Sequence, residues 1–237
     1  MQASAEPGKT FGRVAEAYAR TRPPYSHAAI DRAAAELGLT PESRVLDLGA
    51  GTGKLTQALR ERFAHVVAVE PDRGMREQFV GDVIAGAAEQ IPLPDDAVDA
   101  VFAGEAFHWF EWDAALQEIR RVGHGLAVLA RSWGETEQPG LLPVPFWAEL
   151  KGVWARFHPP GREFPDWKSV VQFDGSETFV ETHRISGRDL VDLHLTASTA
   201  ASIGADERAA IAGRAYPLME QEYDLRVATH LYWKRFA

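Results

Sequence analysis

The sequence predicts an α/β fold with a mostly parallel sheet, because short apolar segments rich in β-branched residues alternate with amphipathic segments from residue 43 to 130. Parallel strands need crossover connections, which are right-handed, so helices are expected on both faces of the sheet. Such a sheet binds its ligands beyond the carboxyl ends of its strands. The expected strands are 43–49, 65–70, 83–87, 96–103 and 126–130, and the expected helices are 54–63, 72–80 and 112–122.

The segments on either side of this alternation predict a helical cap and two closing strands. Residues 10–22 have a helical pattern that ends at Pro23-Pro24, because proline cannot continue the hydrogen bonds of a helix. The later part of the chain predicts a helix at 146–157, a strand at 178–185, helices at 187–200 and 205–222, and a last, antiparallel strand at 225–236. These closing strands extend the sheet at one edge, and the helices between them are expected to cap the ligand edge.

Composition excludes several classes of partner. The 34 acidic and 25 basic residues give a formal charge of −9, which repels nucleic-acid phosphates and anionic membranes. The chain has no cysteine, so it has neither disulfides nor thiolate metal sites, as is typical of a reducing cytoplasm. No apolar run approaches the roughly 20 residues of a membrane helix, and the first residues do not read as a signal peptide. The histidines lack paired ligand spacing, so we expect a cytoplasmic protein without a metal site.

Residues 45–55 read VLDLGAGTGKL, which places three glycines in a turn between an expected strand and an expected helix. A phosphate loop needs a glycine where this chain has Leu48 and a hydroxyl where it has Leu55. A dinucleotide fingerprint needs its third glycine at the place of Lys54 or Thr56, depending on the register. Neither nucleotide-binding pattern fits.

The remaining pattern is Asp-x-Gly-x-Gly-x-Gly, formed by Asp47, Gly49, Gly51 and Gly53. It resembles motif I of the class I S-adenosylmethionine-dependent methyltransferases, in particular the group that includes ubiquinone-biosynthesis and trans-aconitate methyltransferases. The resemblance implies a Rossmann-like methyltransferase sheet with S-adenosyl-L-methionine as cofactor. It also implies that the glycine backbone contacts the methionine part of the cofactor, where a β-carbon would collide.

The same resemblance assigns cofactor contacts along the carboxyl edge of the sheet. Glu70 ends the second strand about 20 residues after the glycines, where a carboxylate can accept hydrogen bonds from both ribose hydroxyls. Met75 is expected to cover the adenine face, and Tyr18 to close over the cofactor. Ala87 stands where the family often has an aspartate that binds the adenine amino group. The predicted cofactor-binding residues are Tyr18, Gly49, Ala50, Gly51, Glu70, Pro71, Met75, Ala88, Glu89 and Glu105.

The acceptor side is expected in the segment GEAFHWF, which follows the fourth strand. His108 is the candidate catalytic base, because imidazole can accept a proton near neutral pH. Trp109 is expected beside the acceptor, as are Arg131 and Trp133, which follow the fifth strand. Two alternatives stay open: the aromatic residues pack as core around a hydrogen-bonded histidine, and Arg131 forms an ion pair with a surface acid.

We therefore expect an enzyme that transfers a methyl group to a small-molecule acceptor by in-line displacement, as a monomer or homodimer. The predicted organisation is a single methyltransferase domain over 1–237, with a helical cap (1–42), a cofactor-binding core (43–132) and a substrate-cap region with the closing strands (133–237). One alternative is a non-catalytic sensor or partner-binding protein that keeps the cofactor fold. A nicotinamide oxidoreductase is the other, against which the misplaced third glycine argues.

Overall fold

The computed structural model describes residues 17, 20–134, 137–157, 166–197 and 203–236. The chain divides into two compact units. The sheet unit comprises 24–131, 166–180 and 228–237, and the helical unit comprises 1–23, 132–165 and 181–227. Both units are therefore assembled from segments far apart in the sequence.

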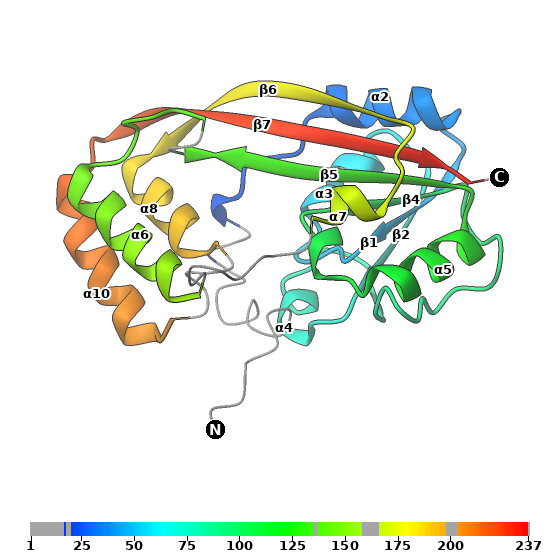
Figure 1. Ribbon diagram of the computed structural model, residues 1–237, viewed down its shortest axis with the longest axis horizontal. Coiled ribbons are helices and arrows are strands. Elements are labelled where there is room, and N and C mark those ends of the chain that lie inside the picture. Colours follow the sequence, from blue (N-terminus) through cyan, green and yellow to red (C-terminus); the bar gives the residue numbers. More distant parts are fainter. Residues whose placement is uncertain (1–16, 18–19, 135–136, 158–165, 198–202, 237) are drawn as a thin grey trace. The chain divides into compact units, whose positions relative to one another are not determined.

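A seven-stranded sheet has the order β3-β2-β1-β4-β5-β7-β6. Its strands are β1 (Arg44–Leu48), β2 (His65–Glu70), β3 (Ile84–Ala85), β4 (Ala100–Gly104), β5 (Gly125–Trp133), β6 (Gly175–Ser186) and β7 (Glu222–Arg235). Strand β1 pairs in parallel with both β2 and β4, so the strand order reverses between β1 and β4. The last strand, β7, runs opposite to β5 (Figure 1). The predicted mostly parallel sheet with an antiparallel last strand is confirmed.

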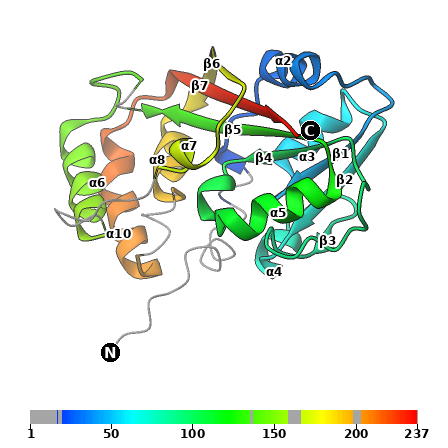
Figure 2. The same cartoon turned by 45° about the vertical axis from the view of Figure 1, so that its right-hand side comes forward.

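Helices cover both faces of the sheet unit, because successive residues of its buried strands point to opposite faces. Val45 packs in one apolar cluster with α2 (His27–Leu37) and α3 (Lys54–Arg60). Leu46 packs in a second cluster with α5 (Trp112–Val122). Figure 2 accordingly shows α2 and α5 on opposite sides of β1 and β4. This alternation confirms the crossover topology that the sequence predicts.

Short helices in the sheet unit begin and end at recognisable caps. The hydroxyl of Ser26 accepts the Ala29 N–H at the start of α2, and Gly38 ends that helix in the left-handed region, with φ of 71°. Asp72 caps α4 (Arg73–Arg76) by accepting the Met75 N–H. Helix α4 is shorter than the predicted helix at 72–80. A 3-10 turn, η3 (Phe107–Trp109), follows β4, and α7 (Trp167–Val170) precedes β6.

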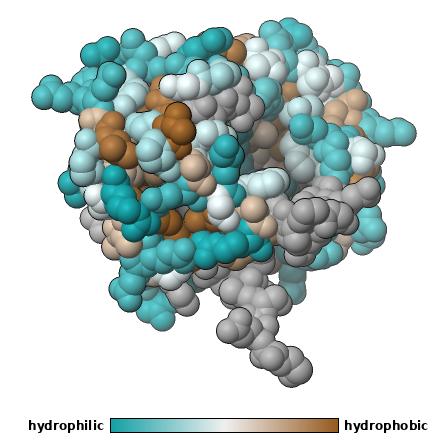
Figure 3. Space-filling view, turned by 60° about the vertical axis from the view of Figure 1, so that its left-hand side comes forward, coloured by the Kyte–Doolittle hydropathy of each residue, from teal (hydrophilic) through white to brown (hydrophobic). Residues whose placement is uncertain are grey.

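The helical unit contains α6 (Val144–Phe157), α8 (Gly187–Leu195), α10 (Ala205–Ala215) and the 3-10 turn η5 (Tyr216–Leu218). Its core includes Phe146 of α6, Leu190 of α8 and Ile211 of α10, all buried. The two predicted helices between the closing strands are present, although both end earlier than predicted. On the face shown in Figure 3, hydrophobic residues lie in small separate patches among hydrophilic ones. No described helix is both long and apolar enough to span a membrane.

Candidate functional site

The glycine turn between β1 and α3 gives its glycines different tasks. Gly49 and Gly51 both have positive φ, 73° and 58°. A β-carbon on Gly49 would lie 2.6 Å from the β-carbon of Ala106, so packing excludes a side chain there. A β-carbon on Gly51 would meet no described atom within 4 Å. Packing therefore closes the Gly49 position to a side chain, whereas Gly51 borders open space that a ligand can enter.

Glu70 is fixed against this turn at the end of β2. Its Oε2 accepts the Gly51 N–H and its Oε1 accepts the Asp72 N–H, each at 2.8 Å. The residue is 6% exposed, and burial raises its pKa, while the two backbone N–H groups act in the opposite direction. Each carboxylate oxygen keeps capacity for a further hydrogen bond, so Glu70 can accept hydroxyl donors from a ligand.

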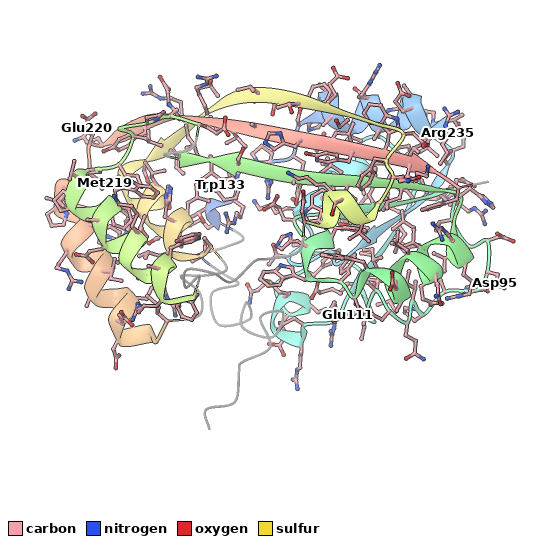
Figure 4. The ribbon with its side chains drawn as sticks, viewed as in Figure 1. Asp95, Glu111, Trp133, Met219, Glu220 and Arg235 are labelled. Carbon is pink, nitrogen blue, oxygen red and sulfur yellow. The ribbon has the colours of Figure 1, made fainter. Side chains whose placement is uncertain are left out.

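Two further predicted stretches lie next to β2. Strand β3 pairs with β2 so that Ala85 stands opposite Glu70, which brings the residues after β3 to the same sheet edge. Ala88 is buried there, and Oε1 of Glu89 accepts the Glu111 N–H at 2.9 Å. Figure 4 labels Glu111, which precedes α5. Ala87 provides no side-chain hydrogen bond for an adenine ring.

The segment that follows β2 holds the predicted Pro71 and Met75. Met75 lies in α4 and is buried, whereas Pro71 is exposed. The guanidinium of Arg76 donates to the carbonyl oxygens of Glu70 and Pro71, at 2.8 Å and 2.7 Å. These bonds hold the turn after β2 in one conformation.

Glu105, the residue after β4, is hydrogen-bonded to Arg131 of β5. Glu105 has a φ of 55°, its N–H donates to the Leu129 carbonyl at 2.9 Å, and its Oε1 accepts the Arg131 N–H. Arg131 lies within β5 and Trp133 ends it, so the prediction that both follow the strand is wrong. Strand β5 continues this far because the long strand β7 lies beside it in the sheet.

Arg131 is 8% exposed, and its guanidinium lies 3.9 Å from the centre of the Tyr25 ring. Such a buried side chain does not belong to the solvated surface. A guanidinium packed on an aromatic face keeps its N–H groups in a fixed plane.

The aromatic residues after β4 divide into packed and exposed members. Phe107 is buried, Phe110 packs edge-on against it at 5.5 Å between ring centres, and Trp112 donates its indole N–H to the Phe107 carbonyl at 3.1 Å. His108 and Trp109 are exposed, with ring centres 4.7 Å apart. The core-packing alternative therefore describes Phe107 and its partners, but not the exposed pair.

Although the His108 side chain is exposed, desolvation by the surrounding protein lowers the pKa of its imidazole. The nearby Glu105 carboxylate acts in the opposite direction. The imidazole is therefore mostly neutral at pH 7. A neutral imidazole on an exposed turn can accept a proton from a bound molecule.

Two predicted residues remain to be accounted for, Tyr18 and Trp133. Tyr18 lies outside the described residues. Trp133, labelled in Figure 4, ends β5 and belongs to the helical unit, where the Arg22 guanidinium lies 4.6 Å from the centre of its ring. As for metals, the described residues contain no group of three His, Asp or Glu side chains that could hold an ion.

Comparisons with known proteins give the family. Residues 46–128 match the model of a methyltransferase domain. An uncharacterized methyltransferase-like protein of Schizosaccharomyces pombe is 32% identical over 173 residues, which cover 70% of this chain and 66% of that protein. The chain belongs to the class I S-adenosylmethionine-dependent methyltransferases. An uncharacterized methyltransferase of Mycobacterium tuberculosis is 45% identical to this methyltransferase over 120 residues, 48% of this chain and 47% of that protein.

The chain therefore spans about half the length of the curated relatives that it matches at 45% identity. Its fold is that of a solved structure described as a candidate type II methyltransferase from Anaeromyxobacter dehalogenans, with a TM-score of 0.61 and 23% identity. That alignment covers 90% of this chain and 97% of the other. The family membership that motif I predicts is therefore confirmed.

The site of this methyltransferase also contains polar groups for which the sequence predicted no role. Asp47 is fully buried, and the Thr56 hydroxyl donates to its Oδ2 at 2.5 Å. Its Oδ1 has no hydrogen-bond partner among the described residues. Burial raises the pKa of Asp47 to about 7. Burial and the charge of Arg131 lower the pKa of Lys54, which follows the glycine turn directly. The only sequence signals for them are that Asp47 begins the motif and that Lys54 follows it.

Proposed function

We propose that the protein transfers the methyl group of S-adenosyl-L-methionine to a small-molecule acceptor. The observation that carries the proposal is the open space at Gly51, bounded by the Glu70 carboxylate. A β-carbon would fill this space, as expected where a ligand approaches the backbone. The buried Oδ1 of Asp47, without a described partner, also favours a polar ligand group next to the turn. Family membership supports the choice of cofactor.

In this proposal, the carboxyl edge of the sheet unit holds the cofactor. Gly49, Ala50 and Gly51 face its methionine part, and Glu70 accepts hydrogen bonds from its ribose hydroxyls. The other cofactor contacts are assigned to Tyr18, Pro71, Met75, Ala88, Glu89 and Glu105. When bound, S-adenosyl-L-methionine supplies an electrophilic methyl group on a sulfonium that leaves as a neutral thioether. We take residues 1–237 as one methyltransferase domain.

The chain's own contribution to the transfer is to align the acceptor and to manage its proton. His108 takes a proton from a hydroxyl or amine acceptor, because its lowered pKa keeps the imidazole neutral at pH 7. Trp109 provides an exposed aromatic face beside it. Arg131 and Trp133 are assigned to the acceptor as well, with Arg131 binding a carboxylate. Alignment and exclusion of water carry most of the rate in such a displacement.

The acceptor is assigned to small molecules because the formal charge of −9 disfavours nucleic acid and anionic membranes. We further propose a cytoplasmic location and a monomeric or homodimeric state.

Calorimetric titration tests binding, and labelled methyl transfer tests turnover. The protein is titrated with S-adenosyl-L-homocysteine, and a panel of carboxylic acids, phenols and amines is then incubated with cofactor labelled in its methyl group. We expect binding and label in at least one acceptor. Binding with no transfer across the panel would favour the sensor alternative. Binding of reduced nicotinamide cofactor in place of S-adenosyl-L-homocysteine would overturn the assignment of S-adenosyl-L-methionine as the cofactor.

A further inference from the structure

The described part of the helical unit contains a cavity of about 410 Å³ along α8 and α10. This volume lies in the range of small-molecule sites. Charged and hydroxyl-bearing side chains form part of its wall, and alanines and a leucine form the rest. The lining residues are Ala17, Arg20, Arg188, Asp189, Asp192, Leu195, Thr196, Ala205, Arg208, Ala209, Ala212 and Tyr216.

The cavity wall has a positive balance in a chain whose formal charge is −9, because three arginines and two aspartates line it. Both aspartates are already bonded within the protein. Asp189 accepts the Arg20 Nε–H at 3.1 Å and the Ser186 hydroxyl at 2.9 Å. Asp192 accepts a second N–H of Arg20 and the Tyr216 hydroxyl, the latter at 2.7 Å. The carboxylates are therefore committed, and one positive charge is left over.

Arg188 is the residue best placed to carry that charge to a ligand. Its side chain is exposed, its guanidinium lies 4.5 Å from the centre of the Tyr216 ring, and the described residues give it no carboxylate partner. The bond from Tyr216 to Asp192 fixes the ring on which the guanidinium lies. Burial and Asp192 raise the pKa of Tyr216 to about 12, so the phenol stays neutral. A guanidinium held on an aromatic face presents a planar fork of N–H donors that matches a carboxylate.

Another part of the wall is apolar. Ala205, Ala209 and Ala212 lie on α10, and Leu195 ends α8. The small side chains of α10 leave room along the helix for a hydrocarbon body.

We propose that this cavity binds a small monocarboxylate, whose carboxylate pairs with Arg188 and whose apolar body lies along the alanines of α10. The single surplus positive charge matches a monoanion, whereas a phosphate dianion would leave uncompensated negative charge inside the wall. The proposal goes beyond methyl transfer and does not depend on it.

Binding of octanoate to the full chain, measured by calorimetry, tests the proposal. Octanol and octyl phosphate serve as probes of the same chain length. We expect octanoate to bind better than either. Arg188→Gln should weaken octanoate binding at least tenfold and leave octanol unchanged. Arg214→Gln is the matched control, because Arg214 also lies in the helical unit but pairs with Glu149 and does not line the cavity. Its octanoate affinity should stay within twofold of that of the unmodified chain.

A second variant, Ala209→Leu, fills the cavity from an exposed position of α10 and should abolish binding of octanoate and octanol alike. Equal octanoate affinity in the unmodified chain and in Arg188→Gln would overturn the proposal. So would stronger binding of octyl phosphate, or no binding of octanoate at millimolar concentration. Titration with S-adenosyl-L-homocysteine in the same samples keeps the two proposals distinct. Its failure would count against methyl transfer and leave the octanoate result to decide the cavity.

Discussion

Replacing Gly51 by alanine tests the cofactor site with the smallest possible change. The new methyl group would enter the space in which no described atom lies within 4 Å of a β-carbon at this position. The methyl group would therefore strain the backbone but would not collide with any described atom of the protein. Gly49→Ala, two residues earlier, is the matched comparison, because its methyl group would meet Ala106 at 2.6 Å.

The expected magnitudes follow from these two environments. Both glycines have left-handed φ, which costs an alanine about 1–2 kcal/mol of folding free energy. Overpacking against Ala106 adds about 1–3 kcal/mol for Gly49→Ala alone. At about 2–4 °C per kcal/mol for a chain of this size, Gly51→Ala should lower the Tm by roughly 2–8 °C, and Gly49→Ala by more.

Gly49→Ala should lose more stability, whereas Gly51→Ala should lose more ligand affinity. Folded Gly51→Ala should lose at least about 1.4 kcal/mol of S-adenosyl-L-homocysteine affinity, which is a factor of ten, because its methyl group occupies the ligand's space. Calorimetric titration below the melting transition, with the Tm from differential scanning calorimetry, checks both values. Unchanged affinity in folded Gly51→Ala would refute the assignment of the turn to the cofactor. An equal loss of stability in both variants would refute the division of tasks between the two glycines.

Three further predictions concern Glu70, Asp47 and His108. Glu70→Ala should weaken binding of S-adenosyl-L-methionine and of its demethylated product equally, by about 1.5–3 kcal/mol, since both carry the same ribose; calorimetry that finds strong discrimination between them would contradict this role. Burial raises the pKa of Asp47 from 3.8 to about 7, so its contribution to stability is fully present below pH 3.8 and is lost as the pH rises through 7. The stability of Asp47→Asn relative to the unmodified chain, measured by urea unfolding, should therefore rise across this window by an amount on the order of 4 kcal/mol, and a flat difference would count against the raised pKa. His108→Ala should keep cofactor affinity within about threefold and reduce turnover about 10²-fold, whereas a loss of affinity as large as that of Glu70→Ala would move His108 to the cofactor shell.

The sequence predicts the sheet unit well because its signals are local. Apolar runs, helical periodicity and the spacing from Asp47 to Gly53 each lie within a few residues of the element that they predict, and Glu70 follows from the end of a strand. The strand order and the packing of both faces then follow from general rules of parallel sheets. The length of β5 was underestimated because it depends on β7, a partner about 100 residues away in the chain.

The helical unit shows why the remaining features were beyond sequence reasoning. Arg20 bonds to Asp189 and Asp192 across some 170 positions, and no periodicity or motif links these residues. Tyr216 and Arg188 likewise come together only when α8 packs against η5, the turn that follows α10. A surface charge run and a charged cavity wall have the same composition, so only the fold decides whether an arginine faces water or a ligand. Family motifs therefore identify the cofactor turn, whereas specificity for an acceptor or another ligand rests on residues that tertiary structure alone gathers.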